Sequence, residues 1–232
     1  MAEGPPGSLP DARRDRPGRL ARLGVLLSGR GSNFVAIHDA IARGEVPAEI
    51  ALVVSNRPEA AGLARARELG LAAVAIPHGA GGRSDHEAEV AAALEAARVD
   101  WICLAGYMRL LSAGFVARFR GRLLNVHPSL LPAFPGLDAQ RQALEYGVKV
   151  SGCTVHLVDE GLDSGPIVVQ RAVPVAEDDT PESLAVRILA EEHRAYPEAL
   201  RRLLTEPWRL DGRRVAFGRE GNPARGPEER RE

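Results

Sequence analysis

The sequence has almost no lysine, little net charge and no long apolar segment. Lys149 is the only lysine among 30 basic residues, and 31 acidic residues bring the formal net charge to −1. A chain this close to neutrality lacks the basic field that attracts nucleic acid. No stretch approaches the roughly 18 consecutive apolar residues that span a membrane, and the arginines near the N-terminus precede no apolar signal segment. These absences predict a cytoplasmic protein that binds neither nucleic acid nor membranes.

Cysteine is also scarce. Cys103 and Cys153 are the only two, and both lie inside apolar stretches at a separation that matches no metal-ligand spacing. In a cytoplasmic protein such residues are expected to be reduced, buried thiols. The sequence therefore predicts no metal site.

Length and composition favour one folded domain with polar ends. The 232 residues include 45% hydrophobic residues, enough for a continuous core, and show no internal repeat. Residues 1–18 are rich in glycine, proline, arginine and aspartate and bury too little apolar surface to fold, and residues 219–232 have a similar composition. We expect two disordered tails around a folded domain at 19–218.

Short apolar runs alternate with amphipathic segments through the middle of the chain. One expected helix carries Phe34 and Ile37 on its inner face and ends at Gly44, and a second covers Ser84–Arg98. The longest begins at Thr180-Pro181 and should kink or restart at Pro197. Expected strands are Leu23–Leu27, Ile50–Ser55, Ala73–Ile76, Trp101–Ala105, Leu123–His127, Cys153–Val158 and Ile167–Val175.

This alternation predicts an α/β fold: an open, mostly parallel, twisted sheet with helices on both faces, of the Rossmann-like type. Ligands of such sheets bind beyond the carboxyl ends of the strands. We therefore looked for functional residues directly after each expected strand.

A glycine-rich loop, Ser28–Asn33, joins the first expected strand to a helix. Free backbone N–H groups at such a turn can bind phosphate. The dinucleotide pattern fails, because Phe34 replaces its third glycine and the second strand ends in Ser55-Asn56 instead of an acidic residue. A mononucleotide or sugar phosphate fits better. A tight turn in which Ser32 or Asn33 only caps the helix is the alternative.

The strand Leu123–His127 ends in two polar residues on one side of the sheet. Residues two apart point the same way, so Asn125 and His127 should emerge together at its carboxyl end. An amide can donate to a developing oxyanion, and an imidazole titrates near neutrality. Asp163, in an acidic loop between two later strands, could raise the pKa of a nearby His127. The alternatives are a strand-end histidine bonded to backbone and a solvated hairpin loop.

The chain resembles the phosphoribosylglycinamide formyltransferases over residues 20–215. The motifs that carry this resemblance, in family order, are Ser28–Asn33 (SGRGSN), Leu104–Leu111 (LAGYMRLL), Leu123–Pro132 (LLNVHPSLLP), Leu162–Pro166 (LDSGP) and Glu192–Pro197 (EHRAYP). The resemblance implies transfer of the formyl group of 10-formyltetrahydrofolate to the amine of a phosphoribosyl glycinamide, in purine synthesis. It also implies small-molecule substrates, no metal, and a monomer or homodimer.

The resemblance further implies a role for individual residues. Asn125 would bind the formyl oxygen, His127 would act as general acid, and Asp163 would raise the pKa of His127 and relay protons. The residues implied for ribonucleotide binding are Gly31, Ser32, Asn33, Pro128 and Glu192. Those implied for folate binding are Arg83, Met108, Arg109, Leu110, Leu111 and Asn125, with the loop Asp159–Asp163 over the pterin. A phosphate-binding half at 19–120 and a catalytic, folate-binding half at 121–218 are expected.

One position departs from the family, and three other functions remain open. Asp138 stands where the family often has a histidine, so altered hydrogen bonding around the site is expected there. His156 is expected to be packed or hydrogen-bonded near the site. The alternative functions are a formyltetrahydrofolate deformylase, a methionyl-tRNA formyltransferase and an inactive folate-binding module. The first two usually carry an extra domain, which the short tails cannot supply.

Overall fold

A single sheet runs through the protein. The computed structural model describes residues 19–79 and 82–218, so both predicted tails lie outside the described residues. In that part of the chain nine strands follow the order β3-β2-β1-β4-β5-β6-β7-β9-β8. β1 to β5 pair in parallel, β5-β6-β7 are antiparallel, and the last two strands form a hairpin whose β9 runs parallel to β7.

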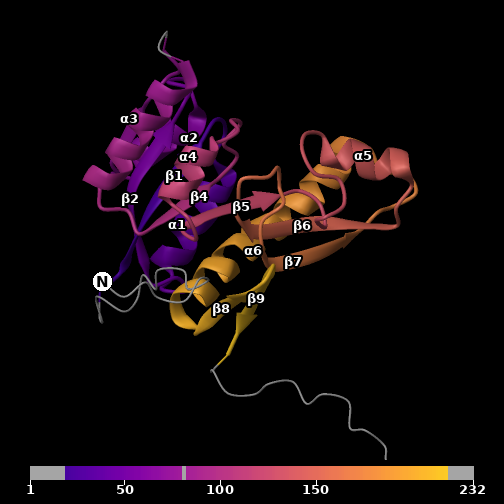
Figure 1. Cartoon of the computed structure of the whole chain (residues 1–232). Helices are drawn as coiled ribbons and strands as arrows, with labels where there is room; N and C mark the ends of the chain where they lie inside the picture. Colours follow the sequence, from indigo (N-terminus) through magenta and orange to yellow (C-terminus); the bar gives the residue numbers. More distant parts are fainter. Residues whose placement is uncertain (1–18, 80–81, 219–232) are drawn as a thin grey trace, which may run out of the picture.

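The elements alternate as predicted over most of the chain (Figure 1). The strands are β1 Ala21–Leu27, β2 Ala48–Ser55, β3 Ala73–Ala75, β4 Trp101–Leu104, β5 Leu123–His127, β6 Val150–Leu157, β7 Ile167–Pro174, β8 Trp208–Asp211 and β9 Arg214–Phe217. The helices are α1 Ser32–Ala42, α2 Ala61–Glu68, α3 Gly82–Ala96, α4 Ala113–Arg118, α5 Ala139–Tyr146 and α6 Pro181–Thr205.

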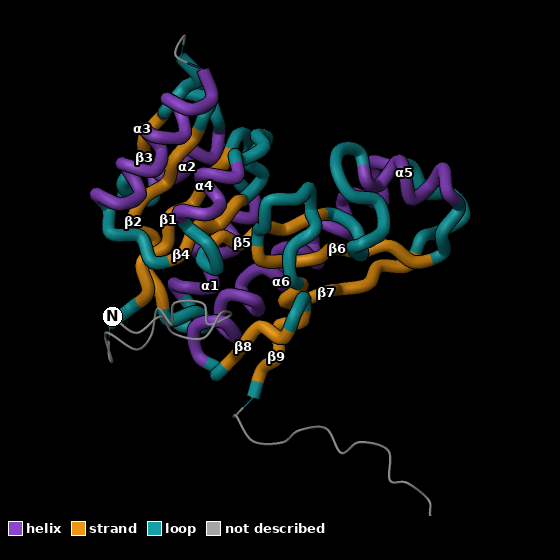
Figure 2. The backbone as a smooth tube through the Cα atoms, in the orientation of Figure 1, coloured by secondary structure: helices purple, strands orange, loops and turns teal. Residues whose placement is uncertain are grey.

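Helices cover both faces of the sheet because alternate strand residues enter two separate cores. Val25 of β1 packs with residues of α1, α2 and α6, whereas its neighbour Leu26 packs with residues of α3 and α4. Figure 2 shows the strands running between these two helix layers. The predicted fold class, a mostly parallel sheet with helices on both faces, is confirmed.

The sheet changes direction where the polar residues of the sequence gather. β4 and β5 are the last strands of the parallel part, and β6 and β7 extend away from it beside α5 (Figure 1). The register of β5 and β6 places Asn125 opposite His156. Since β4 pairs directly with β5, the sheet passes without interruption from residues 19–120 into residues 121–218. The division into a phosphate half and a catalytic half remains a prediction.

The end of the chain differs from the sequence-based expectation. α6 starts at the predicted cap, where Thr180 and Ser183 form a capping box, but it continues unbroken past Pro197 to Thr205 and does not restart. The β8–β9 hairpin was not predicted, although a two-residue loop that begins with glycine, here Gly212-Arg213, is a recognised hairpin signal. In the described residues no helix has the length and apolar character that crossing a membrane requires.

Candidate active site

His127 is held by two acceptors at the carboxyl end of β5. Its side chain is buried, and Nε2 lies 2.8 Å from the carbonyl oxygen of Phe134. Nδ1 lies 3.2 Å from Oδ2 of Asp163. A carbonyl oxygen can only accept, so Nε2 donates to Phe134, and Nδ1 faces the carboxylate of Asp163. The predicted approach of His127 and Asp163 is therefore present in the structure.

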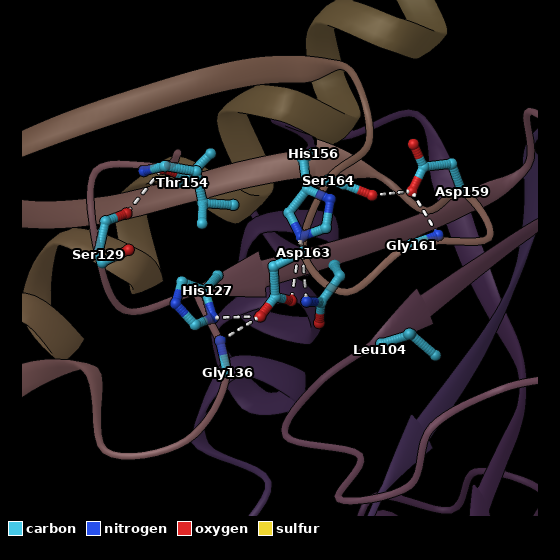
Figure 3. A network of polar contacts seen from close by, with 12 residues as sticks. Leu104, His127, Ser129, Gly136, Thr154, His156, Asp159, Gly161, Asp163 and Ser164 are labelled. Carbon is cyan, nitrogen blue, oxygen red and sulfur yellow. Dashed lines mark hydrogen bonds and ion pairs between the residues drawn. The ribbon is translucent and has the colours of Figure 1, made fainter. Parts of the chain in front are cut away.

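Asp163 reaches His127 from the loop between β6 and β7. Its Oδ2 also accepts a hydrogen bond of 2.8 Å from the backbone N–H of Gly136. The residue has a φ of 47°, in the left-handed region that aspartate tolerates better than most residues. Asp159 stabilises the turn, because its Oδ1 accepts from Ser164 Oγ at 2.6 Å and from the N–H of Gly161 at 3.1 Å. Figure 3 shows Asp163 between His127 and His156.

His156 on β6 borders the same cluster. Its Nδ1 lies 2.9 Å from the carbonyl oxygen of Leu157 and its Nε2 lies 3.2 Å from Nδ2 of Asn125. A longer distance of 3.8 Å separates Nε2 from Oδ1 of Asp163. Burial lowers the pKa of His156, although the Leu157 carbonyl and the Asp163 charge act in the opposite direction. The expectation that His156 is hydrogen-bonded at the site is confirmed.

The glycine loop ends in an uncapped helix N-terminus. Gly31 is the N-cap residue of α1, with a φ of 74°, and no side chain caps the helix. The structure therefore contradicts the alternative in which Ser32 or Asn33 caps it. A Cβ on Gly31 would lie 2.9 Å from the Cα of Gly62 on α2, whose N–H donates to the Gly29 carbonyl at 2.9 Å. Close packing of these two glycines fixes the loop at an uncapped helix N-terminus, a position that can bind an anion.

Asn33 and Glu192 meet beside this loop although 159 positions separate them in the sequence. Asn33 Nδ2 donates to Glu192 Oε2 over 2.7 Å, and each residue is only 7% exposed. Burial raises the pKa of Glu192, and the bond from Asn33 opposes that shift. Asn33 Oδ1 is also buried and has no hydrogen-bond partner within the described residues. The pair therefore offers an unused acceptor, Asn33 Oδ1, beside the glycine loop.

The predicted folate-binding residues lie on the loop after β4 and at the start of α3. Ser28 Oγ accepts from the backbone N–H of Met108 at 2.9 Å, so this loop is tied to the glycine loop. The side chains of Met108 and Leu110 are 65% and 68% exposed, whereas Leu111 packs against the core on the α3 and α4 face. Arg109 Nη2 lies 3.2 Å from His78 Nδ1, and Arg83 pairs with Glu87 at 3.1 Å.

Other predicted positions are less constrained. Pro128 follows His127 directly and is half-buried. Asp138 is exposed, with a φ of 55°, and precedes α5 without capping it. Cys103 and Cys153 are free and buried, and burial raises the pKa of each thiol to about 12. Across 19–79 and 82–218, no group of three or more histidine, cysteine, aspartate or glutamate residues could hold a metal ion.

Comparison with known proteins places this geometry in a family. Residues 21–200 match the formyl transferase family. The phosphoribosylglycinamide formyltransferase of Escherichia coli K12 is 41% identical over 190 residues, which cover 82% of this chain and 87% of that protein. The chain belongs to the formyl transferase family. The resemblance of its motifs to phosphoribosylglycinamide formyltransferases is thereby confirmed.

Two further similarities concern a larger protein and a solved structure. The trifunctional purine biosynthetic protein adenosine-3 of Drosophila melanogaster is 53% identical over 190 residues, and the chain spans only 14% of that relative's length. The crystal structure of glycinamide ribonucleotide transformylase 1 from Symbiobacterium toebii is 51% identical, with a TM-score of 0.82, and the match covers 86% of this chain and 95% of that one.

Three groups that contact the candidate site of this formyl transferase were not predicted from the sequence: the Phe134 carbonyl, the Gly136 N–H and the helix residue Gly62. The carbonyl of Phe134 and the N–H of Gly136 bond the catalytic candidates His127 and Asp163. A Phe-Pro-Gly turn after the strand could have suggested such a role, because turns expose backbone groups. Gly62 carried no sequence signal, since only its contact with the glycine loop explains it.

Proposed function

We propose that the protein transfers the formyl group of 10-formyltetrahydrofolate to the amine of N1-(5-phospho-D-ribosyl)glycinamide. The products are the N2-formyl compound and tetrahydrofolate, in a step of de novo purine synthesis. The observation that carries the proposal is the cluster of Asn125, His127 and Asp163 at the carboxyl end of β5. The proposal includes small-molecule substrates without a metal, a cytoplasmic location, and a monomer or homodimer.

The ribonucleotide would bind between the glycine loop and α6. The backbone N–H groups of Gly31, Ser32 and Asn33 would hold its phosphate at the N-terminus of α1, where no side chain competes for them. Glu192 would accept hydrogen bonds from the ribose hydroxyls with its remaining lone pairs. Pro128 would contact the same substrate, since it follows His127 at the strand end.

The folate would bind against the loop after β4. Met108 and Leu110 present uncovered apolar side chains there, which suits a flat ring system. Leu111 supports that wall from the core, and Arg83 and Arg109 supply cations for a carboxylate. When bound, 10-formyltetrahydrofolate supplies the formyl carbon. The loop Asp159–Asp163 would close over the pterin.

The catalytic residues would stabilise charge and move one proton. A bond forms between the substrate amine and the formyl carbon, and the bond from that carbon to the folate nitrogen breaks. Asn125 would donate a hydrogen bond to the formyl oxygen as it gains negative charge, and protonated His127 would add its positive charge. The amine loses a proton and the folate nitrogen gains one, a transfer that Asp163 would support directly or through water.

Both ring nitrogens of His127 contact protein acceptors, so one contact must open before His127 can donate to a ligand. The contact with Asp163 is the longer of the two, at 3.2 Å, against a hydrogen bond of 2.8 Å to the Phe134 carbonyl. We therefore assign the donating role to Nδ1: its proton would go to the ligand, and Asp163 would take up the proton that the amine loses, directly or through water. Hydrogen bonds at such sites commonly rearrange when substrate binds.

The test is to incubate the purified protein with 10-formyltetrahydrofolate, with and without the ribonucleotide, and to follow the folate product by absorbance. Product that requires the ribonucleotide supports the proposal. Product formed without it would indicate a deformylase. If no product forms in either case, a methionyl-tRNA formyltransferase and an inactive folate-binding module would be the remaining alternatives. Asn125→Ala should lower kcat about 10²- to 10³-fold if it supplies an oxyanion donor.

A further inference from the structure

Asn125 and His156 contact each other because two antiparallel strands place them in register. Asn125 lies on β5 and His156 lies directly opposite on β6. Their side chains share one face, and Asn125 Nδ2 is 3.2 Å from His156 Nε2. His156 is only 2% exposed, so its ring is shielded from bulk water.

The backbone decides which nitrogen of His156 carries the proton. Nδ1 lies 2.9 Å from the carbonyl oxygen of Leu157, which can only accept, so Nδ1 must be the donor. In the neutral ring Nε2 then presents a lone pair. That lone pair can accept one N–H of the Asn125 amide, which fixes the amide nitrogen toward His156 and leaves the second N–H free for a ligand.

We propose that neutral His156 is a positioning residue: it orients the Asn125 amide so that its second N–H, and not its oxygen, is presented to the formyl oxygen. The inference rests on the proposed function, since it concerns the donor that this reaction requires. A carboxamide held only by water could present either end, and the wrong end would place an acceptor against a developing negative charge. Fixing the amide in advance removes that choice before the reaction begins.

Burial, more than the surrounding charges, keeps this arrangement in its working form. The groups that face the ring are Asp163 and Asp159 on the loop after β6, and His127 and Asn125 on β5; β7 contributes Ile167 by backbone pairing. Burial is the largest effect on the pKa of His156 and lowers it, and the charge of His127 acts in the same direction, whereas the Leu157 carbonyl and the charges of Asp163 and Asp159 oppose it. Protonation of Nε2 would place its N–H against the N–H of the Asn125 amide, so the amide would have to rotate by half a turn to present its oxygen to His156.

The kinetic test is a double-mutant cycle with His156→Phe and Asn125→Ala. Phenylalanine keeps the ring packing but removes the acceptor. In the wild-type background kcat should fall about 10-fold with little change in either KM, since only transition-state stabilisation is lost. In the Asn125→Ala background the same change should cost less than about 2-fold, because His156 acts through Asn125. Equal losses in both backgrounds, or a KM effect alone, would overturn the proposal.

His156→Gln serves as the conservative variant. Its side-chain oxygen can accept from Asn125, so kcat should recover to within about 3-fold of the wild type. A glutamine variant as slow as the phenylalanine variant, with both still folded by thermal denaturation, would also count against the proposal.

A second readout does not depend on the reaction. Nitrogen-15 NMR of histidine-labelled protein at neutral pH should show His156 as the Nδ1–H tautomer, and the Asn125→Ala variant should identify the signal by shifting Nε2. An Nε2–H tautomer or an imidazolium would refute the inference even in an active enzyme. If the assay instead shows no ribonucleotide-dependent transfer while the tautomer is as expected, the proposed function fails and the hydrogen-bond geometry stands.

Discussion

Glu192→Gln should strengthen the fold and weaken the enzyme. Glu192 is 7% exposed, and burial raises its pKa. The folded protein therefore keeps this proton in a pH range where the unfolded chain releases it, above the ordinary glutamate value of about 4.3. In that range stability falls as pH rises, and above the folded pKa the loss is complete. Glutamine cannot ionise, so it avoids this loss and can still accept the bond from Asn33.

The binding effect has the opposite sign. A hydrogen bond to a charged group contributes about 1.5–3 kcal/mol and a neutral one about 0.5–1.5 kcal/mol. If Glu192 receives the ribose hydroxyls as a carboxylate, its replacement should cost about 1–2 kcal/mol of ribonucleotide binding. That corresponds to a KM roughly 5- to 30-fold higher, since about 1.4 kcal/mol is a factor of ten. The KM for the folate should not change.

The measurements are denaturant unfolding at several pH values and steady-state kinetics with each substrate varied. The stability gain of Glu192→Gln over the wild type should be absent near pH 4 and should grow as pH rises to neutrality. Glu191→Gln is the matched control, because Glu191 pairs with Arg171 and Arg194 instead of facing the glycine loop. A Glu192→Gln protein that is less stable at neutral pH, or that binds the ribonucleotide normally, would refute the reasoning.

Three further predictions test other parts of the structure. Asp163→Asn keeps an acceptor for Gly136 but removes the charge facing His127. The rate constant of formyl transfer in single-turnover assays should therefore fall about 10²- to 10⁴-fold. A near-normal rate constant would contradict the assignment. Gly62→Ala would bring a Cβ within 3.0 Å of the glycine loop and should raise the ribonucleotide KM but not the folate KM. Tyr196→Phe removes a buried hydroxyl 2.8 Å from the Leu124 carbonyl, which should cost about 1–3 kcal/mol in denaturant unfolding; an unchanged midpoint would argue that this bond contributes nothing.

The sequence predicted those parts of the site that depend on strand alternation. Asn125 and His127 had to share a side because their strand has a period of two, and the strand itself was identified over exactly Leu123–His127. The glycine loop was located by its place between an apolar run and a helix. Both inferences use only neighbours in the chain, which is why they needed no tertiary information.

The rest depended on contacts that no local pattern encodes. Asp163 meets His127 from a loop where its backbone is left-handed, with a φ of 47°, a conformation that the presence of an aspartate does not predict. Phe134 and Gly136 act through backbone atoms, so their side chains carry no signal. The family resemblance supplied the link to Asp163 before the structure did.

The bond between Asn33 and Glu192 also has a consequence for synthesis on the ribosome. It joins α1, near the start of the fold, to the last helix, so the proposed ribonucleotide site is incomplete until α6 has emerged and docked. A nascent chain that has already formed its parallel strands would still have no complete pocket. Ribonucleotide binding should therefore protect only finished molecules, and it would favour their survival over truncated ones in the presence of proteases.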